Sequence, residues 1–346
     1  ARLVGHPLAT DAELEQAAEE LLALGPASVL IKGGHRPGDL AQDFWTDGSD
    51  AFWLTSRRAE GGGHGTGCVL AAALASGLAH GMDIPDSLVL AKAYVRQAIR
   101  TAPDIGAGDS PVRPGDWPSD PGDLPWLTER ADTGRERPEF PRETRLPYGL
   151  YPIVDNLNLF QDLLPSGLRI LQLRIKDPSA PGLEETVEEA IRLARAAGIA
   201  LYINDHWQLA IRHGAYGVHL GQDDLSPDAV SAIRASGLRL GISTHSYREV
   251  ARAMAFRPTY IALGTVYPAF SKQIDYPPLG PEHFRRIRRL IDAPVVAIGG
   301  MNLERGRAMR DAGADGCAAI AEIQRSPDPA ATVAAWHGLF GIGSRG

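Results

Sequence analysis

The sequence predicts an α/β protein that ends in a parallel (β/α)8 barrel, the TIM-barrel fold, preceded by a smaller, partial α/β segment. Three observations favour this organisation. Short apolar segments alternate with amphipathic ones throughout residues 148–346, as in repeated strand–helix units. Polar or charged side chains follow most of these apolar segments directly. A stretch rich in proline and glycine, residues 104–147, separates this region from residues 1–103.

Length and composition exclude several classes of protein. The chain has 346 residues, of which 44% are apolar and 22% charged, which is typical of a globular protein with more than one domain. The net charge of −7 argues against nucleic acid as the main partner. Cys68 and Cys317 form no disulfide framework. Without an apolar run of the about 20 residues that a membrane requires or a secretory leader, we expect a cytoplasmic protein without membrane contacts.

The N-terminal segment, residues 1–103, contains a glycine-rich turn that suits an anion. A capping box at Thr10–Glu13 predicts a helix that Gly25 ends, and we expect strands at residues 28–31 and 52–54. The sequence Gly-Gly-Gly-His-Gly-Thr-Gly-Cys, residues 61–68, then leads into a helix over residues 69–79. Free N–H groups at such a helix start bind phosphate, and a thiolate is favoured there. A structural turn beside a core cysteine explains the pattern equally well.

The region after this segment reads as a linker followed by eight strands. Residues 104–147 are dense in proline and lack apolar periodicity, which indicates a partly extended interdomain linker. Three helices are clearest, over residues 184–196, 282–291 and 303–312, and Ser226-Pro227 marks a further helix start. The strands expected in the barrel are residues 150–154, 168–173, 199–203, 216–220, 238–242, 260–263, 295–298 and 316–320.

Two neighbouring strands each deliver a carboxylate at the carboxyl end. The third strand is followed by Asn204-Asp205, and the fourth by Gln222-Asp223-Asp224. In a barrel of parallel strands these ends meet on the catalytic face. Two converging carboxylates suit Mg²⁺ shared with a substrate phosphate. The alternative is that Asp205 and Asp224 only cap the following helices.

The other strand ends supply the parts of a polyphosphate site. Cations and a metal on this face would stabilise charge on a departing pyrophosphate, and the Gly-Gly pair after strand seven lies where barrels commonly bind phosphate. Taken singly, Arg174 or Lys272 could be a surface charge and His219 a core histidine. The residues that follow the remaining strands are Arg174 and Lys176, Ser243 to His245, Gly264 through Lys272, Gly299-Gly300, and Ala321-Glu322.

Six motifs stand at the strand ends of residues 148–346. They are Gln172-Leu-Arg-Ile-Lys176, Asn204-Asp205, Gly217-Val-His-Leu-Gly-Gln-Asp-Asp224, Gly241-Ile-Ser-Thr-His245, Gly264-Thr-Val-Tyr-Pro268 with Lys272, and Ala297-Ile-Gly-Gly-Met301. With these motifs, residues 148–346 resemble thiamine phosphate synthases over nearly their whole length. The resemblance implies a transferase of thiamine biosynthesis that joins hydroxymethylpyrimidine pyrophosphate to a thiazole phosphate and releases pyrophosphate. The accepted chemistry of that family is dissociative, through a pyrimidine-methyl cation that the thiazole nitrogen captures.

Roles follow from this resemblance position by position. Asp205 and Asp224 would bind Mg²⁺, and Gly300 would offer its N–H to the thiazole phosphate. Ser243 would contact the pyrimidine or the leaving group, and Gln172 would shape the pyrimidine pocket. The residues that would hold the pyrophosphate and pyrimidine are Arg174, Lys176, Asn204 and Lys272.

The thiazole phosphate subsite departs from the family pattern at two places. The family usually has Thr-x-Thr before the lysine, where this chain has Ala269-Phe270-Ser271. It usually ends strand eight with a serine that holds the thiazole phosphate, where Ile320 is followed by Ala321 and Glu322. Each lost hydrogen bond to a charged group is worth about 1.5–3 kcal/mol. We therefore expect a weakened thiazole subsite beside an intact pyrophosphate subsite.

The N-terminal segment resembles the C-terminal part of hydroxymethylpyrimidine (phosphate) kinases of the ribokinase-like superfamily. The motifs are Val29-Leu-Ile-Lys-Gly-Gly-His35, His64-Gly-Thr-Gly-Cys68 and Ala91-Lys-Ala-Tyr-Val95. The resemblance makes Gly65, Thr66 and Gly67 the anion hole, with Cys68 as general base in place of the usual Asp. About 100 residues cannot close that core alone, so we expect no kinase activity, and ATP binding only if a separate N-terminal kinase fragment completes the fold.

Two other functions remain open at this point. A thiazole tautomerase-like barrel would handle no pyrophosphate, and the four residues Asp205, Asp224, Arg174 and Lys176 argue against it. A catalytically impaired binding or regulatory protein is the second alternative, which the incomplete kinase segment and the altered thiazole subsite favour. The oligomeric state, including a homo-oligomer, is not determined by the sequence.

Overall fold

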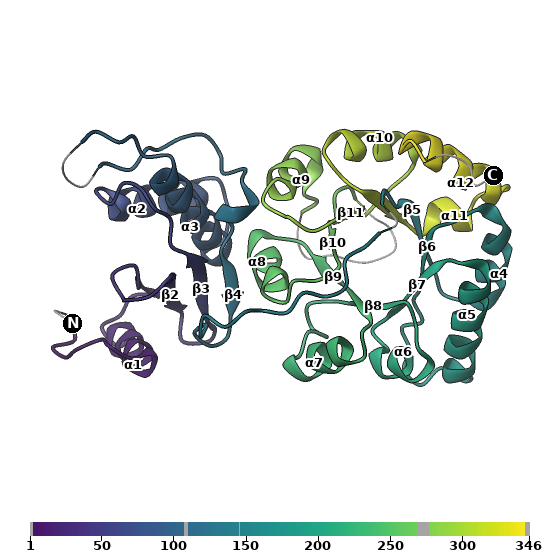
Figure 1. Cartoon of the computed structure of the whole chain (residues 1–346), viewed down its shortest axis with the longest axis horizontal. Coiled ribbons are helices and arrows are strands. Elements are labelled where there is room, and N and C mark those ends of the chain that lie inside the picture. Colours follow the sequence, from purple (N-terminus) through teal and green to yellow (C-terminus); the bar gives the residue numbers. More distant parts are fainter. Residues whose placement is uncertain (1–2, 107–109, 145, 269–276, 343–346) are drawn as a thin grey trace. The chain divides into compact units, whose positions relative to one another are not determined.

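The computed structural model describes residues 3–106, 110–144, 146–268 and 277–342. The chain forms two compact units (Figure 1). The first comprises Ala1–Arg137 together with Ser246–Ala255, and the second comprises Pro138–His245 and Phe256–Gly346. Each unit has its own sheet, and each is described separately below.

The second unit is a closed barrel of eight parallel strands, which confirms the predicted fold class. Consecutive strands are hydrogen-bonded neighbours, and β12 closes the barrel against β5. Every strand that the sequence predicts in this region is present, and no strand end differs from the prediction by more than two residues. The strands are β5 (Gly149–Val154), β6 (Ile170–Leu173), β7 (Ala200–Asn204), β8 (Gly217–Leu220), β9 (Arg239–Thr244), β10 (Tyr260–Leu263), β11 (Val295–Ile298) and β12 (Gly316–Ala319).

Helices surround this barrel (Figure 1). The start of α7 carries the cap that the sequence indicates: Ser226 accepts a hydrogen bond from the N–H of Ala229, and Pro227 is the first helical residue. Such a start satisfies N–H groups that a helix leaves free. The helices are α4 (Leu157–Leu163), η2 (Leu164–Ser166), α5 (Leu183–Ala197), α6 (Trp207–His213), α7 (Pro227–Ala235), α9 (Gly280–Arg288), α10 (Leu303–Asp311), α11 (Ala321–Gln324) and α12 (Pro329–Leu339).

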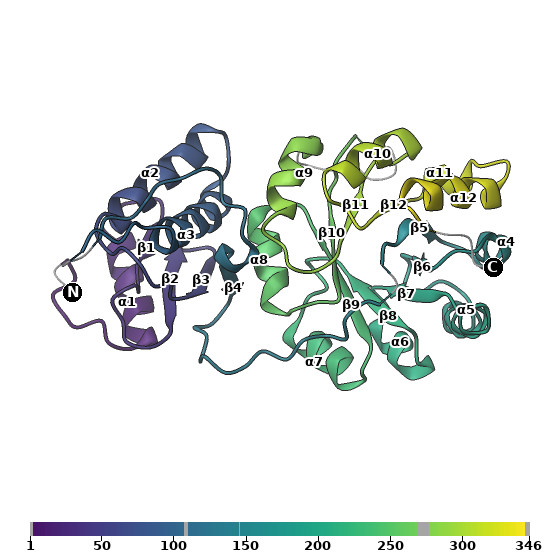
Figure 2. The same cartoon turned by 45° about the horizontal axis from the view of Figure 1, so that its top comes forward.

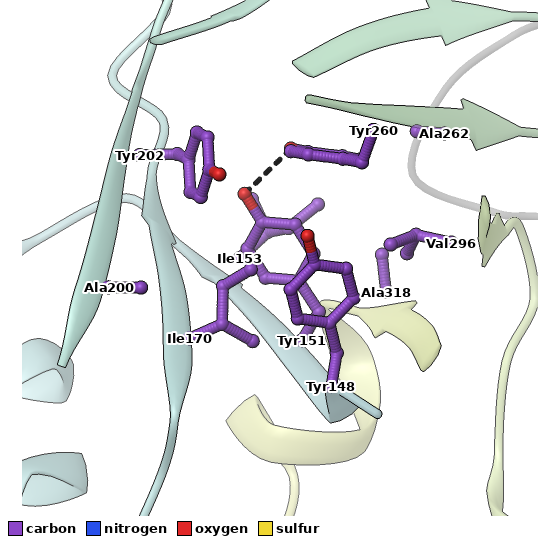
Figure 3. Packing of buried hydrophobic residues seen from close by; sticks show 10 residues of the cluster. All are labelled: Tyr148, Tyr151, Ile153, Ile170, Ala200, Tyr202, Tyr260, Ala262, Val296 and Ala318. Carbon is purple, nitrogen blue, oxygen red and sulfur yellow. Dashed lines mark hydrogen bonds between the residues drawn. The ribbon is translucent and has the colours of Figure 1, made fainter. Parts of the chain in front are cut away.

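A cluster of tyrosines fills the barrel interior (Figure 3). The ring of Tyr260 meets that of Tyr202 edge-on with centroids 5.1 Å apart, and its hydroxyl lies 2.8 Å from the hydroxyl of Tyr151. Glycine makes room for these rings on the neighbouring strands. A Cβ on Gly241 would lie 2.2 Å from the Tyr260 ring, and one on Gly217 would lie 2.4 Å from the Tyr202 ring. The glycines in the β8 and β9 motifs therefore serve the packing of the core.

A buried carboxylate lies beside this tyrosine cluster. Glu143 precedes the first barrel strand and is 9% exposed. It accepts hydrogen bonds from the hydroxyls of Tyr216 at 3.0 Å and Tyr202 at 3.4 Å. A buried charge is tolerated only where donors surround it, so the segment just before β5 is part of the second unit's core.

The first unit contains an antiparallel sheet in the order β1-β2-β3-β4 (Figure 2). The predicted strands correspond to β1 (Val29–Ile31) and β3 (Ala51–Arg57). Two further strands were not predicted, β2 (Leu40–Thr46) and β4 (Trp126–Thr128). The stretch that the sequence analysis treats as a linker, residues 104–147, contains β4 and the short helix η1 (Pro121–Asp123).

Helices complete the first unit. The capping box predicted at Thr10 and Glu13 is present at the start of α1 (Asp11–Leu22), which packs on β1 and β2. Lys92 forms an ion pair with Asp43, both largely buried, with Nζ and Oδ2 2.6 Å apart. The other helices are α2 (Thr66–Ala79), α3 (Ile84–Arg100) and α8 (Tyr247–Ala255).

The helix α2 is apolar yet poorly covered. Its sequence, Thr-Gly-Cys-Val-Leu-Ala-Ala-Ala-Leu-Ala-Ser-Gly-Leu-Ala, contains no charged residue, but Gly77 is its one buried residue, and Leu78 is 43% exposed. Helices that are apolar on all sides are normally buried.

None of the helices in the ranges that the structure describes is long and apolar enough to cross a membrane.

Candidate active site

Two carboxylates meet beyond the ends of β7 and β8. Asn204 ends β7 and is 5% exposed, and Asp205 follows it with a positive φ of 62°. The N–H of Asp205 donates to the carbonyl of His219 on the neighbouring strand at 3.0 Å. The turn after β8 brings Asp224 back, with its N–H directed at the carbonyl of Gly221. A left-handed backbone is unusual for a residue other than glycine. Asp205 adopts it at the position from which its carboxylate interacts with that of Asp224.

The pair is electrostatically strained. Partial burial raises the pKa of Asp205, and the negative charge of Asp224 raises it further, while the positive charge of Arg174 lowers it. Two like charges held together favour a proton or a cation between them. The predicted convergence of Asp205, Asp224 and Arg174 is therefore present in the structure.

The groups predicted to hold the pyrophosphate and pyrimidine differ in how far they are buried. Arg174 and Ser243 are half-buried at the ends of β6 and β9, whereas Lys176 is exposed. Gln172 is 2% exposed on β6 and donates through Nε2 to the hydroxyl of Tyr151 at 3.4 Å. Ser271 and Lys272, with the Ala269 and Phe270 of the altered motif, lie outside the described residues.

The predicted phosphate turn follows β11. Gly299 and Gly300 have positive φ values of 100° and 61°, and a Cβ on Gly300 would lie 2.6 Å from the carbonyl oxygen of Pro268. Only glycine fits this approach without strain. Arg305, in the first turn of α10, donates to the carbonyl of Gly300 at 2.5 Å and stacks over the Tyr267 ring at 4.7 Å. This cation lies beside the turn that the sequence assigns to the thiazole phosphate.

The end of β12 lacks the hydroxyl that the family usually has there. Ile320 is half-buried and packs against the tyrosine cluster, and Ala321 is the exposed first residue of α11. Glu322 follows in the same short helix. Ala321, which stands where the family usually has a serine, therefore lies just beyond the end of β12.

Two carboxylates would supply only part of the coordination of a Mg²⁺ ion. Within the described ranges, the side chains of His, Cys, Asp and Glu form no group of three or more that could hold a metal ion. Mg²⁺ usually keeps waters and binds through one or two carboxylates plus substrate phosphates. The two facing carboxylates, with the raised pKa of Asp205 as a sign of their repulsion, fit that pattern.

The candidate anion hole of the first unit forms a helix start. Gly65 has φ of 90° and precedes α2, so Thr66, Gly67 and Cys68 occupy its first turn. Cys68 is exposed. The ammonium of Lys32 lies over this turn, 3.1 Å from the position that a Cβ on Gly67 would take. A cation at a glycine-rich helix start suits a bound anion.

The contacts of three residues, His219, Arg305 and Lys32, are not predicted from the sequence. His219 was considered only as a core histidine, yet its Nε2 lies 2.8 Å from Ser243 Oγ. Its position two residues before the strand-end glycine, on the same strand that delivers Asp224, is the signal that could have indicated it. Arg305 and Lys32 lie beside glycine turns that were recognised, but a turn alone does not show which cation approaches it.

Comparison with known proteins places both units. The family model for thiamine monophosphate synthase matches residues 150–323, and that for phosphomethylpyrimidine kinase matches residues 1–113. The chain is 47% identical over 210 residues to the thiamine-phosphate synthase of Enterobacter sp. (strain 638), covering 60% of this chain and 98% of that protein. It is 48% identical over 195 residues to the enzyme of Citrobacter koseri, covering 56% and 91%.

A solved structure agrees with these relatives. Thiamine phosphate pyrophosphorylase from Pyrococcus furiosus has a TM-score of 0.52 and 26% identity, and the match covers 57% of this chain and 98% of that one. The matched length corresponds to one complete barrel. With its eight-stranded barrel and the carboxylates that converge at the strand ends, the chain belongs to the thiamine monophosphate synthase family, and the segment that precedes the barrel in sequence matches the phosphomethylpyrimidine kinase model.

Proposed function

We propose that the barrel catalyses thiamine phosphate synthesis from hydroxymethylpyrimidine pyrophosphate and thiazole phosphate at the carboxyl ends of its strands. In this reaction the bond between the pyrimidine methylene and the pyrophosphate oxygen breaks, and its electron pair leaves on pyrophosphate. The thiazole nitrogen then donates its lone pair to the methylene carbon. The single observation that supports this site best is the facing of Asp205 and Asp224 beside Arg174.

Each group at the site has a distinct task in this proposal. Mg²⁺, when bound, supplies positive charge to the departing pyrophosphate. Asp205 and Asp224 hold the metal, and Arg174, Lys176 and Lys272 bind the pyrophosphate oxygens as charge develops on them. Asn204 and Gln172 hold the pyrimidine ring. Ser243 contacts the ring or its leaving group.

The acceptor subsite lies at the glycine turn after β11. The N–H of Gly300 would bind the thiazole phosphate, and the nearby guanidinium of Arg305 adds positive charge. Ser271, Ile320 and Ala321 would border this subsite. Because Ala321 replaces a serine of the family, we propose that backbone donors and Arg305 hold this phosphate.

The kinase segment contributes no phosphoryl transfer by itself in this proposal. Two features favour completion of this segment by a further kinase fragment. The apolar helix α2 is largely uncovered, and among the described strands β1 is hydrogen-bonded to β2 alone. Such a fragment would allow ATP to bind and the Gly65–Cys68 turn to receive the transferred phosphoryl group. The kinase product is the substrate of the synthase, so joining the two segments would couple successive steps. Soluble small molecules of this kind favour a cytoplasmic location.

Replacement of Asp224 tests this site. Asp224→Ala should abolish Mg²⁺-dependent formation of thiamine phosphate, because the proposed metal site loses one of its two carboxylate ligands. The neighbouring, exposed Asp223→Ala is the matched control and should retain activity. Circular dichroism would establish that both variants are folded. Full turnover by the Asp224→Ala variant would exclude the two-carboxylate metal site.

A further inference from the structure

A continuous chain of hydrogen bonds crosses the barrel interior from Gln172 to Ser243. Gln172 Nε2 lies 3.4 Å from the Tyr151 hydroxyl, which lies 2.8 Å from the Tyr260 hydroxyl (Figure 3). The Tyr260 hydroxyl lies 2.7 Å from Nδ1 of His219, and Nε2 of His219 lies 2.8 Å from Ser243 Oγ. Four strands, β6, β5, β10 and β8, thus connect to a side chain on β9.

The chain is shielded from solvent until its last member. Tyr151, Tyr260, Gln172 and His219 are each at most 5% exposed, whereas Ser243 is half-buried at the active-site end. His219 sits within the chain of hydrogen bonds, with Nδ1 toward the Tyr260 hydroxyl and Nε2 toward Ser243 Oγ. A neutral imidazole donates from one of these nitrogens and accepts at the other.

With the Gln172 amide oriented so that Nε2 faces the Tyr151 hydroxyl, the hydrogen positions along the chain of hydrogen bonds follow from this first link. Gln172 Nε2 can only donate, so it occupies an acceptor position of Tyr151. The Tyr151 hydroxyl then donates to Tyr260, and the Tyr260 hydroxyl donates to His219 Nδ1. His219 must carry its hydrogen on Nε2, which donates to Ser243 Oγ.

The opposite direction leaves a buried donor without an acceptor. If Ser243 donated to His219, the Tyr260 hydroxyl would donate to Tyr151. The Tyr151 hydrogen would then face Gln172 Nε2, which is itself a donor. A buried donor without a partner costs about 1–3 kcal/mol, so the direction that starts at Gln172 is favoured.

We propose that this chain fixes His219 in its Nε2-protonated tautomer and so makes Ser243 a directed hydrogen-bond donor to the substrate. Because Ser243 Oγ already accepts from His219, its own hydrogen points to a different acceptor, such as an oxygen or ring nitrogen of the pyrimidine substrate. A donor that is oriented in advance stabilises charge without reorganisation in the transition state. His219, Tyr260 and Tyr151 are positioning residues, since they act through Ser243.

The identity of the acceptor rests on the proposed function, but the tautomer is a property of the unliganded protein. It can be read by ¹H–¹⁵N NMR of the ¹⁵N-histidine-labelled full chain without substrates, with the His219 signals identified by their loss in the His219→Gln variant. The expected result is a protonated Nε2 and an unprotonated Nδ1. A protonated Nδ1, or a ring protonated on both nitrogens, would overturn the proposal. This measurement tests the tautomer even if the protein makes no thiamine phosphate.

A pair of matched substitutions then tests the link to Ser243. Tyr260→Phe removes one hydroxyl from the chain of hydrogen bonds and keeps the aromatic ring of residue 260. Tyr148→Phe is the control, because the buried Tyr148 hydroxyl has no hydrogen-bond partner among the described residues and its ring packs in the same cluster. Tyr151→Phe, one link further along, serves as a second break if Tyr260→Phe does not fold.

The kinetic outcome distinguishes positioning from packing. Tyr260→Phe should lower kcat/KM for the pyrimidine substrate by roughly tenfold to a hundredfold, the range of one hydrogen bond to a charged group, while Tyr148→Phe leaves it nearly unchanged. The Tyr260→Phe, Ser243→Ala double variant should lose no more than Ser243→Ala alone. Equal effects of Tyr260→Phe and Tyr148→Phe, or losses that multiply in the double variant, would overturn the proposal.

Discussion

The carboxyl group of Asp205 faces that of Asp224, and the pKa of Asp205 is raised by partial burial and then by the charge of Asp224. Asp205 is delivered by the end of β7 and Asp224 by the turn after β8. The unfolded chain does not hold these charges together. The site therefore stores repulsion that a bound cation would relieve.

Substitution of Asp205 should separate stability from activity. Because the folded state holds the Asp205 proton more tightly than the unfolded state, its contribution to stability is lost as pH rises through the raised pKa. Asp205→Asn should therefore raise the melting temperature in EDTA at pH 7, and the gain should disappear at pH 3. The same variant should lose Mg²⁺-dependent turnover. A lower melting temperature at pH 7 would contradict the repulsion.

His219 should make the protein sensitive to acid. Burial lowers its pKa from 6.5 to about 3. Between these two pH values the histidine is protonated in the unfolded state but stays neutral in the folded state. Stability from this group is complete above 6.5 and declines towards pH 3. Urea unfolding at pH 7 and pH 5 should show a smaller loss in His219→Gln than in the unmodified chain. Equal losses would mean that His219 takes up its proton in the folded barrel.

Restoring a hydroxyl at the end of β12 should strengthen the acceptor subsite. Ala321→Ser should lower KM for thiazole phosphate by roughly tenfold, the effect of one added hydrogen bond to a charged group, and leave KM for the pyrimidine substrate unchanged. Ala331→Ser, at an exposed position near the start of α12, is the control. An unchanged thiazole KM would mean that Ala321 lies away from the phosphate.

Glu143 should be needed for the stability of the barrel. Glu143→Ala removes an acceptor of the Tyr202 and Tyr216 hydroxyls. Tyr202 is fully buried, and the loss of the acceptor of a buried hydroxyl costs about 1–3 kcal/mol. Glu139→Ala, in the same segment, breaks surface ion pairs with Arg257 and Arg142, each worth about 0–1 kcal/mol. Urea unfolding of both variants measures the difference. Equal, small losses would show that the segment before β5 contributes little to the core.

The barrel could be predicted because its pattern is local. Each of its strands is a short apolar run with a turn or a helix on either side, and strand ends fix where Asp205, Asp224 and Gly300 lie. The strand β2 escaped prediction because its Gln42-Asp43 pair interrupts the apolar pattern. The buried Asp43 is tolerated because it accepts from the N–H of Gly33 and pairs with Lys92, which is far away in the sequence. The role of His219 depends on Tyr260, 41 residues distant. Such pairings become visible only once the strands are assembled.

The most direct test of the account is synthesis of thiamine phosphate by the full chain. The protein would be supplied with hydroxymethylpyrimidine pyrophosphate, thiazole phosphate and Mg²⁺, with EDTA as the control, and both thiamine phosphate and pyrophosphate would be measured. We predict that the two products appear in equal amounts and only with the metal. Absence of both products while the pyrimidine pyrophosphate binds would contradict the synthase assignment and favour a binding role for the barrel.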